Sequence, residues 1–446
     1  MYYSFLIFFY LLSKNLCNCS NLFINDFGGS SNGESDVLTA QNNGVAFSKM
    51  IKSSKPNDTI YILKNETIYY IPDQENPFFS NLTNITIIID GKIILHDNNT
   101  MWPMYNDLSY YNAFDIRDSN NVNITGSGTI DGQGYNWWKD FLLHKIVRQR
   151  PTIININDSI NISISRLYLH NSPRFNIYCD NVLYAEISLL TIWVDVIYQK
   201  NILQSFKIPI FPFNTDGIDV KGKFIHIHDI NISNYDDTVC VKPSKNTTKK
   251  LNNLMMDCSS NILVENIIIH EGAGISIGSV SSSHMSCIKN VTYRKIVAYN
   301  PLKLIYVKTG AIDNAETYNA IIENITYIDI RAYNPILWPI YIGPQQQKEP
   351  DGTGDGIWPV TNPFVNISNI YISDIIVENA YSKPGIIRCN NTNPCKNIKF
   401  NSVQIKYKNY NDFDNRYICD DDISVYGSYD SRTHPSISNC GLTPSV

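Results

Sequence analysis

Short runs of β-branched residues alternate with polar residues along most of the chain. Isoleucine or valine occupies every second position in these runs, which is typical of a strand with one buried face. The runs recur at intervals of about 20 to 40 residues, a period that indicates a repeat architecture. Each run contains asparagine next to isoleucine or valine, and most begin with it. The runs are Asn84–Asp90, Asn123–Asp131, Asn161–Leu167, Phe224–Ser233, Asn261–Ile269, Asn290–Ile296, Asn324–Ile330 and Asn366–Ile372.

This pattern predicts an all-β chain folded as a parallel β-helix. Stacked coils would bury the alternating isoleucines against the coils above and below, and asparagine at the turns tolerates left-handed backbone. An antiparallel sandwich of similar short strands is the alternative. Only residues 36–51 read as a helix, with Asp36 as its N-cap. No linker interrupts the pattern, so we expect one domain over residues 21–446.

Composition narrows the classes of protein that the chain could belong to. The chain has 446 residues, of which 43% are hydrophobic and 17% charged, so it is not an intrinsically disordered protein. The net charge of −5 argues against a nucleic-acid-binding protein, which normally carries a basic surface. We expect a monomer without a cofactor.

The N-terminus predicts export. Residues 1–12 form an apolar run of signal-peptide length, too short for a membrane span, although no basic residue precedes it. We therefore expect a signal peptide over residues 1–20, a secreted mature chain and no stable membrane insertion after cleavage. Many Asn-x-Ser/Thr sequons follow, so some glycosylation is expected.

Eight cysteines remain beyond the predicted cleavage region, and an even number in an exported chain predicts disulfides. Zinc binding is the alternative, but no Cys-x-x-Cys pair or Cys/His cluster has ligand spacing. Short intervening loops favour three bridges, namely Cys240 with Cys258, Cys389 with Cys395, and Cys419 with Cys440.

Two acidic segments carry the candidate chemistry. Asp216 lies in Asn214-Thr-Asp-Gly217, and Asp236 and Asp237 follow about one repeat later. Neighbouring coils would therefore bring the three carboxyl groups to one face. Clustered carboxyls repel, which raises at least one pKa and keeps a proton available near neutral pH. In inverting glycoside hydrolysis, one carboxyl donates a proton to the leaving oxygen and a second carboxyl activates a water molecule.

Simpler interpretations of these aspartates remain open. Aspartate, asparagine and glycine are ordinary turn residues, so both segments could be solvated turns. Aspartate clusters also bind calcium, although no calcium-loop spacing is present and no metal is expected. Adjacent residues on a regular strand point to opposite faces. Asp236 and Asp237 can act together only if the strand bends or ends between them.

Several further segments resemble glycoside hydrolase family 28, the polygalacturonases and their relatives. The resemblance covers most of the mature chain and is most specific at Asn214–Gly217 and Asp236-Asp237. It extends to Asp26-Phe-Gly28, Gly126–Gly134 with Trp137-Trp138, Asn171-Ser-Pro173, Gly272–Ser279 and Tyr306-Val-Lys-Thr309. The family fold is a right-handed parallel β-helix, and its members invert the anomeric centre.

Carried over by position, this resemblance implies roles for individual residues. Asp236 would be the general acid, and Asp216 and Asp237 would hold and activate water. Lys308 would bind a substrate carboxylate. Tyr341 is a candidate sugar contact, with a core or interface aromatic as the alternative.

Two positions depart from the family pattern. The family's Gly-His-Gly reads Gly272-Ala273-Gly274, so the usual histidine is absent, and the nearby His270 is expected to be structural. Tyr306 stands where the family has arginine, and a tyrosine cannot supply that charge to a substrate carboxylate. Tyr306 is retained as a candidate substrate-binding residue.

The sequence therefore supports three hypotheses about function. The first is a secreted, inverting hydrolase of α-galacturonosyl linkages in pectin-like polysaccharides, divergent or exo-acting in its specificity. The second is a catalytically impaired carbohydrate-binding or cell-wall protein that retains the fold, which the two departures motivate. The third is a pectate lyase, which shares the β-helix but needs calcium and an arginine base. Function must be argued from the site and not from the fold alone.

Overall fold

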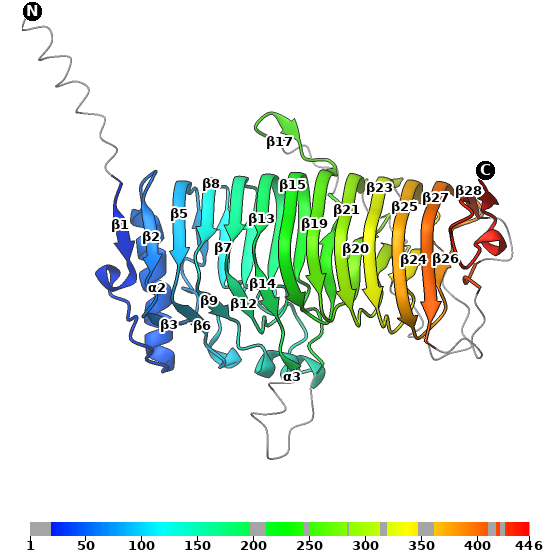
Figure 1. Ribbon diagram of the computed structural model, residues 1–446. Helices are drawn as coiled ribbons and strands as arrows, with labels where there is room; N and C mark the ends of the chain where they lie inside the picture. The colour runs from blue at the N-terminus through cyan, green and yellow to red at the C-terminus, as the bar shows by residue number, and fades with distance from the viewer. Residues whose placement is uncertain are drawn as a thin grey trace, which may run out of the picture.

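The computed structural model describes residues 19–196, 211–244, 250–282, 285–312, 319–346, 361–408, 416–419 and 424–445. Parallel strands stack into a right-handed β-helix, as the repeated phrases predict. Figure 1 shows the strands side by side from β1 at one end to β28 at the other. Most of the predicted signal peptide, residues 1–18, lies outside the described residues.

The longest parallel stack passes through every coil and contains the long strands. β15 spans 16 residues and bends at Gly222, Phe224 and Asp229, so it also pairs in the other stacks. The stack consists of Asn21–Phe23 (β1), Thr59–Ile62 (β2), Thr83–Ile89 (β5), Asn120–Thr125 (β8), Ile160–Ser165 (β11), Ile177–Ser188 (β13), Ile218–Ser233 (β15), Ser259–Ile269 (β19), Cys287–Tyr299 (β21), Ala320–Tyr333 (β23), Val365–Ala380 (β25), Cys395–Tyr407 (β27), Val425–Tyr429 (β28) and Thr443–Pro444 (β29).

A second stack of short strands carries the acidic segments and is called the site sheet here. It consists of Phe78–Ser80 (β4), Phe114–Arg117 (β7), Ile154–Asn157 (β10), the first residues of β13 and β15, Asp237–Val241 (β16), Gly274–Val280 (β20), Ile305–Thr309 (β22), Ile340–Gln345 (β24) and Gly385–Ile387 (β26).

The third stack covers the N-terminal half of the described chain. It contains Thr67–Tyr70 (β3), Lys92–Leu95 (β6), Thr129–Asp131 (β9), Tyr168–His170 (β12) and Thr191–Trp193 (β14), and the end of β15 continues it. An antiparallel hairpin of Lys250–Leu251 (β17) and Leu254–Met255 (β18) stands apart from the coils. Single 3-10 turns occupy Ile24–Phe27, Asn99–Met101 and Ser438–Cys440.

Rows of isoleucine and valine fill the interior of the solenoid. In the site sheet one such row runs through Ile218, Val239, Ile275, Ile305 and Ile340, which are paired from coil to coil and fully buried. Apolar residues at matching positions remove each other from water, at about 25 cal/mol per Å² buried. The alternation in the sequence therefore sets which residues face outward, because the neighbours of each buried residue lie on the other face.

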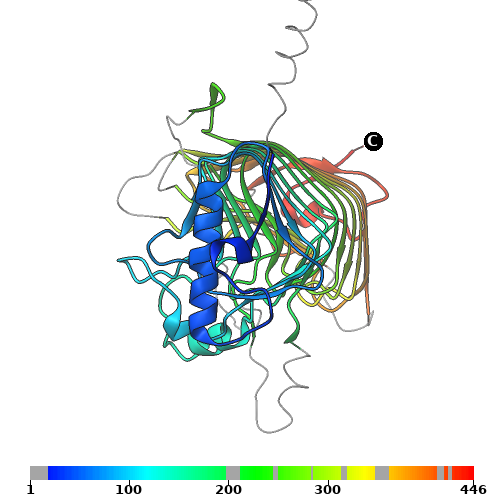
Figure 2. The ribbon, with the colours of Figure 1, turned by 90° about the vertical axis from the view of Figure 1, so that its left-hand side faces the viewer.

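A helix closes the N-terminal end of the solenoid. α2 (Val37–Ser53) lies across the first coils, as Figure 2 shows, and the Asp36 side chain accepts a hydrogen bond from the Thr39 amide. This confirms the predicted helix and its N-cap. Asn43 is buried and donates to the Tyr69 carbonyl. α2 thereby covers an edge that would otherwise expose unpaired strand groups.

A second helix, α3 (Tyr135–Leu142), was not predicted from the sequence. It contains Trp137 and Trp138, which are both buried, so the structure favours packing over sugar stacking for this pair. The Trp138 indole N–H donates to the Ser172 carbonyl at 3.0 Å. Neither α2 nor α3, nor any other helix of the described residues, has the length and apolarity that crossing a membrane requires.

Three disulfides occur among the described cysteines, and two of them confirm the predictions. Cys389 is bonded to Cys395, and Cys419 to Cys440. The predicted bridge between Cys240 and Cys258 is wrong. Cys258 is instead bonded to Cys287. Because β19 and β21 are adjacent, the Cα atoms of these two cysteines lie 4.6 Å apart. Cys240 is a buried free thiol on the site sheet.

Stacked asparagines form a ladder at one corner of the coils. Asn261, Asn290 and Asn324 occupy equivalent positions, each with φ between 54° and 58°. The Asn290 amide nitrogen donates to the Asn261 side chain at 3.3 Å, and Asn324 donates to Asn290 at 3.1 Å. The same residue thus accepts left-handed backbone and bonds the next coil. This explains why the strand phrases keep asparagine at one position.

We predict that Asn290→Ala lowers the free energy of unfolding by about 1–2 kcal/mol, because it combines left-handed strain with the loss of a ladder hydrogen bond. The midpoint of chemical denaturation measures the effect. Asn290→Gly is the matched control, since glycine removes the strain but not the lost bond, and it should fall between alanine and wild type. Equal stability of Asn290→Ala and wild type would show that the ladder contributes nothing.

Candidate active site

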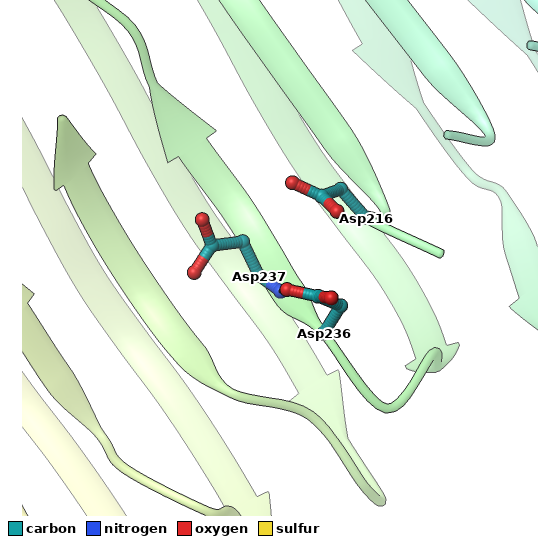
Figure 3. Close-up of side chains that lie close together, drawn as sticks. All are labelled: Asp216, Asp236 and Asp237. Atoms are coloured by element: carbon teal, nitrogen blue, oxygen red, sulfur yellow. The ribbon is translucent and has the colours of Figure 1, made fainter. Parts of the chain in front are cut away.

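The three predicted aspartates meet on the site sheet. Asp216 lies two residues before β15, and Asp236 and Asp237 lie at the start of β16 on the next coil. Gly217 donates its amide to the Asp237 carbonyl at 2.8 Å, which fixes the two segments side by side. One carboxylate oxygen from each of the three aspartates lies within 4.8 Å of the other two (Figure 3). The expected convergence of these residues is therefore confirmed.

The backbone changes direction just before the Asp236-Asp237 pair. Tyr235 has φ of 62°, and β16 begins only at Asp237, so Asp236 is not held to the alternation of a strand. The Asn234 side chain locks the turn by donating to the carbonyls of Asp236 and Asp237 at 3.0 and 2.8 Å. This meets the condition that the strand must bend or end for both aspartates to serve one site.

Asp237 is buried between two ammonium groups. Its Oδ2 atom lies 2.5 Å from Lys308 Nζ and 3.5 Å from Lys242 Nζ. Its Oδ1 atom accepts a hydrogen bond from the Ser276 hydroxyl at 2.7 Å. Burial opposes ionisation, but the charges of Lys308 and Lys242 outweigh it and lower the pKa of Asp237. Asp237 is therefore ionised at neutral pH.

Asp236 is the most exposed of the three carboxyls. Its two oxygens accept the backbone amides of Asp237 and Asn214 at 2.8 and 2.9 Å. Burial, followed by the negative charge of Asp237, raises the pKa of Asp236 above its usual value, while Lys308 acts against the shift. A proton is therefore retained on Asp236 to higher pH than on an ordinary aspartate.

Asp216 and a fourth carboxyl, Asp219, complete the cluster. Burial and the charges of Asp236 and Asp219 raise the pKa of Asp216 well above its usual value. Asp219 is fully buried, and Lys242 Nζ lies 3.3 Å from its Oδ2 and 3.6 Å from Oδ2 of Asp216. Four carboxyls thus share two ammonium groups. Because cations are in the minority, the cluster retains protons near neutral pH.

Lys242 and Asp219 were not recognised as site residues from the sequence. The ammonium of Lys242 lies among three buried aspartates, Asp216, Asp219 and Asp237. Alternation could not have identified them, because Asp219 lies three residues after Asp216 and Lys242 lies five residues after Asp237. The register between coils places them together, since it pairs Asp219 with Cys240, two residues before Lys242.

The ammonium groups also bear on the calcium alternative. A divalent cation at the three aspartates would lie beside Lys308 Nζ and Lys242 Nζ, which already occupy Oδ2 of Asp237. Like charges at such distances repel strongly in a buried site. The donor set therefore fits protonated or lysine-paired carboxyls better than a resident metal ion.

The predicted substrate-binding residues lie beyond the aspartates, on β22 and β24. Lys308 is 1% exposed and paired with Asp237, so its expected role toward a substrate carboxylate stays a prediction. Tyr341 is fully buried and packs edge-on against Tyr306, with ring centres 5.0 Å apart. This packing is what the alternative interpretation, a core aromatic, describes. A sugar contact at Tyr341 stays a prediction.

Tyr306 carries no positive charge of its own, but two lysine ammonium groups lie against its ring. Lys303 Nζ lies 3.9 Å from the centre of its ring and Lys308 Nζ lies 4.3 Å away. Aromatic faces attract ammonium groups. The tyrosine in place of the family's arginine therefore contacts two lysines, one of which, Lys308, is paired with Asp237. Lys303, a buried residue that the sequence did not single out, restores positive charge on this coil.

The position of the absent histidine is occupied by a small buried side chain. Ala273 donates its amide to the Asp236 carbonyl at 2.7 Å, so it lies directly beside the aspartate pair. His270 stacks on Tyr299, and its Nε2–H donates to Oδ1 of Asn231 at 2.8 Å. His270 thus has the structural position that was expected, and no imidazole replaces the missing one next to Ala273 among the described contacts.

We predict that Asp219→Asn stabilises the protein increasingly as pH rises from 4 to 7. Burial raises the pKa of Asp219 to about 6, against 3.8 for the free side chain, although Lys242 partly offsets this. Folded protein then keeps a proton that the unfolded chain releases, so wild-type stability falls as pH rises through this window. The asparagine variant lacks that loss.

The measurement is the melting temperature of variant and wild type between pH 4 and 7. Asp329→Asn, an exposed turn residue on β23 with φ of 55°, is the control and should give a constant difference. A constant or falling difference for Asp219→Asn would show that Asp219 is ionised throughout.

Comparison with known proteins agrees with this geometry. Residues 71–420 match the sequence model of a family described as glycosyl hydrolases family 28. A protein named "Probable endo-xylogalacturonan hydrolase A" from Aspergillus oryzae is 27% identical over 252 residues, 56% of this chain and 55% of that protein. A polygalacturonase from Chamaecyparis obtusa is 28% identical over 233 residues, 49% and 38% of the two chains. The matched part spans about half or less of these relatives.

A solved structure shows the same fold over nearly the whole chain. Endo-xylogalacturonan hydrolase from Aspergillus tubingensis superposes with a TM-score of 0.60 at 19% identity, covering 94% of this chain and 98% of that one. The family match spans most of the sequence and includes both aspartate segments. On these grounds the chain belongs to glycosyl hydrolases family 28.

Proposed function

We propose that this protein is a secreted glycoside hydrolase that cleaves α-galacturonosyl linkages in pectic polysaccharides. The observation that carries the proposal is the carboxyl cluster, in which Lys308 and Lys242 lower the pKa of Asp237 despite its burial, while burial and the charge of Asp237 raise the pKa of the neighbouring Asp236. Hydrolysis of a glycosidic bond requires one carboxyl that donates a proton beside another that is ionised. The names of the related proteins, which act on galacturonan chains, support the choice of substrate.

Asp236 is the proposed general acid. It is the only one of the three aspartates that is not fully buried, so it can reach the oxygen of a bound glycosidic link. Its raised pKa keeps the proton that the leaving group must receive. Asp237 in turn maintains that raised pKa, because its negative charge lies next to Asp236.

Asp237 is proposed to activate water together with Asp216, in a single displacement. Both Asp237 oxygens are engaged, by Ser276 on one side and by the two lysines on the other. A carboxylate bound in this way is a poor nucleophile toward carbon but can still accept a proton from water. Asp216 Oδ1 is buried and has no hydrogen-bond partner among the described residues. Because the pKa of Asp216 is raised, we propose that Asp216 holds the water while the ionised Asp237 accepts its proton.

The spacing of the carboxyls is short for this mechanism. Nearest oxygens lie within 4.8 Å, whereas carboxyl groups of most inverting enzymes are about 6.5–9.5 Å apart and those of retaining enzymes about 5–5.5 Å apart. We favour inversion because the engaged oxygens of Asp237 argue against a covalent intermediate. The stereochemistry of the product decides between the two.

Export is part of the proposal. Three disulfides among the described cysteines are typical of an oxidising compartment, since such bonds are rare in the cytosol. A polysaccharide of the cell wall would be encountered outside the cell. The apolar N-terminal run is the segment proposed to direct export.

A catalytically impaired carbohydrate-binding protein is the second candidate. Ala273 beside the aspartate pair and Tyr306 in place of arginine remove two polar groups that the family pattern contains. Loss of both would weaken contacts to the transition state without necessarily abolishing the binding of a sugar chain. Binding of pectic oligosaccharides without any turnover would favour this candidate.

We predict that Asp236→Asn lowers hydrolysis of polygalacturonate or xylogalacturonan by about 10²–10⁴-fold, because an amide cannot donate the proton to the leaving oxygen. Release of reducing ends measures the rate. Asp329→Asn is the control for a distant aspartate and should retain wild-type activity. Equal rates for Asp236→Asn and wild type would exclude Asp236 as the acid.

We also predict that the first product carries the inverted, β anomeric configuration at its new reducing end. Proton NMR, recorded during the first minutes of hydrolysis and before mutarotation, distinguishes the two anomers directly. An initial α product would contradict single displacement and would point to a covalent intermediate on one of the three aspartates.

A further inference from the structure

An arginine-lined hollow lies on the N-terminal side of the carboxyl cluster. Its volume is about 360 Å³, within the range of ligand sites, and its walls include Phe141, Arg148, Arg150, Arg174 and Asn214. Arg150 and Arg174 shortly precede β10 and β13, and Asn214 shortly precedes β15, so all three lie at the same edge of the site sheet as Asp216.

The hollow and the carboxyl cluster share a wall. The Asn214 amide donates to Asp236 Oδ2 at 2.9 Å, and the Asn214 side chain accepts from Arg150 Nη2 at 3.2 Å. A chain that places its scissile bond at Asp236 therefore has its neighbouring unit beside Arg150. This contact makes the hollow an extension of the site and not a separate surface pocket.

Arg150 is a buried cation whose bonding is incomplete. The side chain is 2% exposed, its guanidinium lies 4.2 Å from the centre of the Phe141 ring, and Nη2 donates to the Phe213 carbonyl at 2.5 Å. Its Nη1 atom is buried and has no hydrogen-bond partner among the described residues. Leaving such a donor unsatisfied is costly, and an anionic group would satisfy it.

The positive charge around Arg150 is not fully compensated by ion pairs of the described residues, so an additional anion would be attracted to it. Burial, followed by the charge of Arg174, lowers the pKa of Arg150 to about 9, although Asp236 and Asp216 act in the opposite direction. Neither arginine forms an ion pair within the described part of the chain, whereas Arg174 donates to the Gln149 side chain at 2.9 Å. Asp107 also lines the hollow, and the hydrogen bond that it accepts from the Ser109 amide, followed by the charge of Arg148, lowers its pKa.

We propose that this hollow is a subsite for one uronate unit of the substrate, whose carboxylate binds Arg150 Nη1 and the guanidinium of Arg174. The inference rests on the proposed function and names the place where the acidic sugar is bound. Guanidinium groups match the planar geometry of a carboxylate and bind it with two parallel hydrogen bonds. Recognition of charge on this side compensates for the arginine that Tyr306 replaces on the other side of the aspartates.

The test is binding of trigalacturonate and of its fully methyl-esterified form to the Asp236→Asn protein, measured by titration calorimetry. The two ligands differ in charge and hardly in shape. We expect the acid to bind at least 10-fold more tightly than the ester. Adding Arg174→Gln should reduce this preference to less than about 3-fold, because the half-exposed Arg174 can be replaced without opening the core.

Two further variants secure the result. Arg331→Gln removes an exposed arginine on β23, away from the site sheet, and should leave the preference unchanged. Arg150→Lys keeps the charge but removes the planar fork, and should reduce the preference if circular dichroism shows a folded protein. If it does not fold, Arg174→Gln alone decides.

The outcomes separate this inference from the proposed function. An unchanged preference in the Arg174→Gln variant, or no binding of either ligand, overturns the subsite, whatever the wild type hydrolyses. Failure of the wild type to release reducing ends from any pectic substrate overturns the proposed hydrolase, even if the acid binds through Arg174. Loss of the preference together with wild-type hydrolysis supports both.

Discussion

The register between neighbouring coils is the constraint on which the site depends. Parallel strands in this fold lie about 4.8 Å apart, so residues one repeat apart in sequence become direct neighbours. Pairing of Ile218 with Val239 and of Asp237 with Gly274 brings β15, β16 and β20 into line. A slip by one residue would turn every outward carboxyl inward. The buried isoleucine row therefore holds the catalytic geometry as well as the fold.

Close spacing of this kind makes the charges interdependent. Lys308, two coils beyond β16, keeps Asp237 ionised, and Asp237 in turn raises the pKa of Asp236. The lysine that the family resemblance assigns to substrate is thus coupled to the acid through a buried aspartate. Its removal would change the protonation of the cluster as well as any contact with a sugar. Asp219 joins the same network from β15 on the preceding coil, and Lys242 joins it from the residue that follows β16.

Much of the fold and part of the site could be predicted because they follow from local patterns. Alternating isoleucine identifies the buried face, and repeated asparagine marks the left-handed corners. Asp216, Asp236 and Asp237 were found because one repeat separates them. Lys242, Lys303 and Arg150 were missed because nothing local distinguishes an outward lysine or arginine from a solvated one. Only the neighbouring coils bury them.

The erroneous disulfide has the same origin as the missed cations. Sequence proximity favoured Cys240 with Cys258, but Cys240 faces the site sheet while Cys258 and Cys287 stand on adjacent strands of the longest stack. In a solenoid, two residues are close in space when they lie on adjacent coils and on the same face, whatever their separation along the chain.

The same rule explains the distribution of cations around the aspartates. Lys303 and Lys308 approach from the C-terminal coils and Arg150 from the N-terminal side. An anionic polymer lying along the coils would therefore meet positive charge on both sides of the carboxyl cluster, even without the arginine at position 306. The changes at Ala273 and Tyr306 thus leave together the three carboxyls on which the proposed hydrolysis depends.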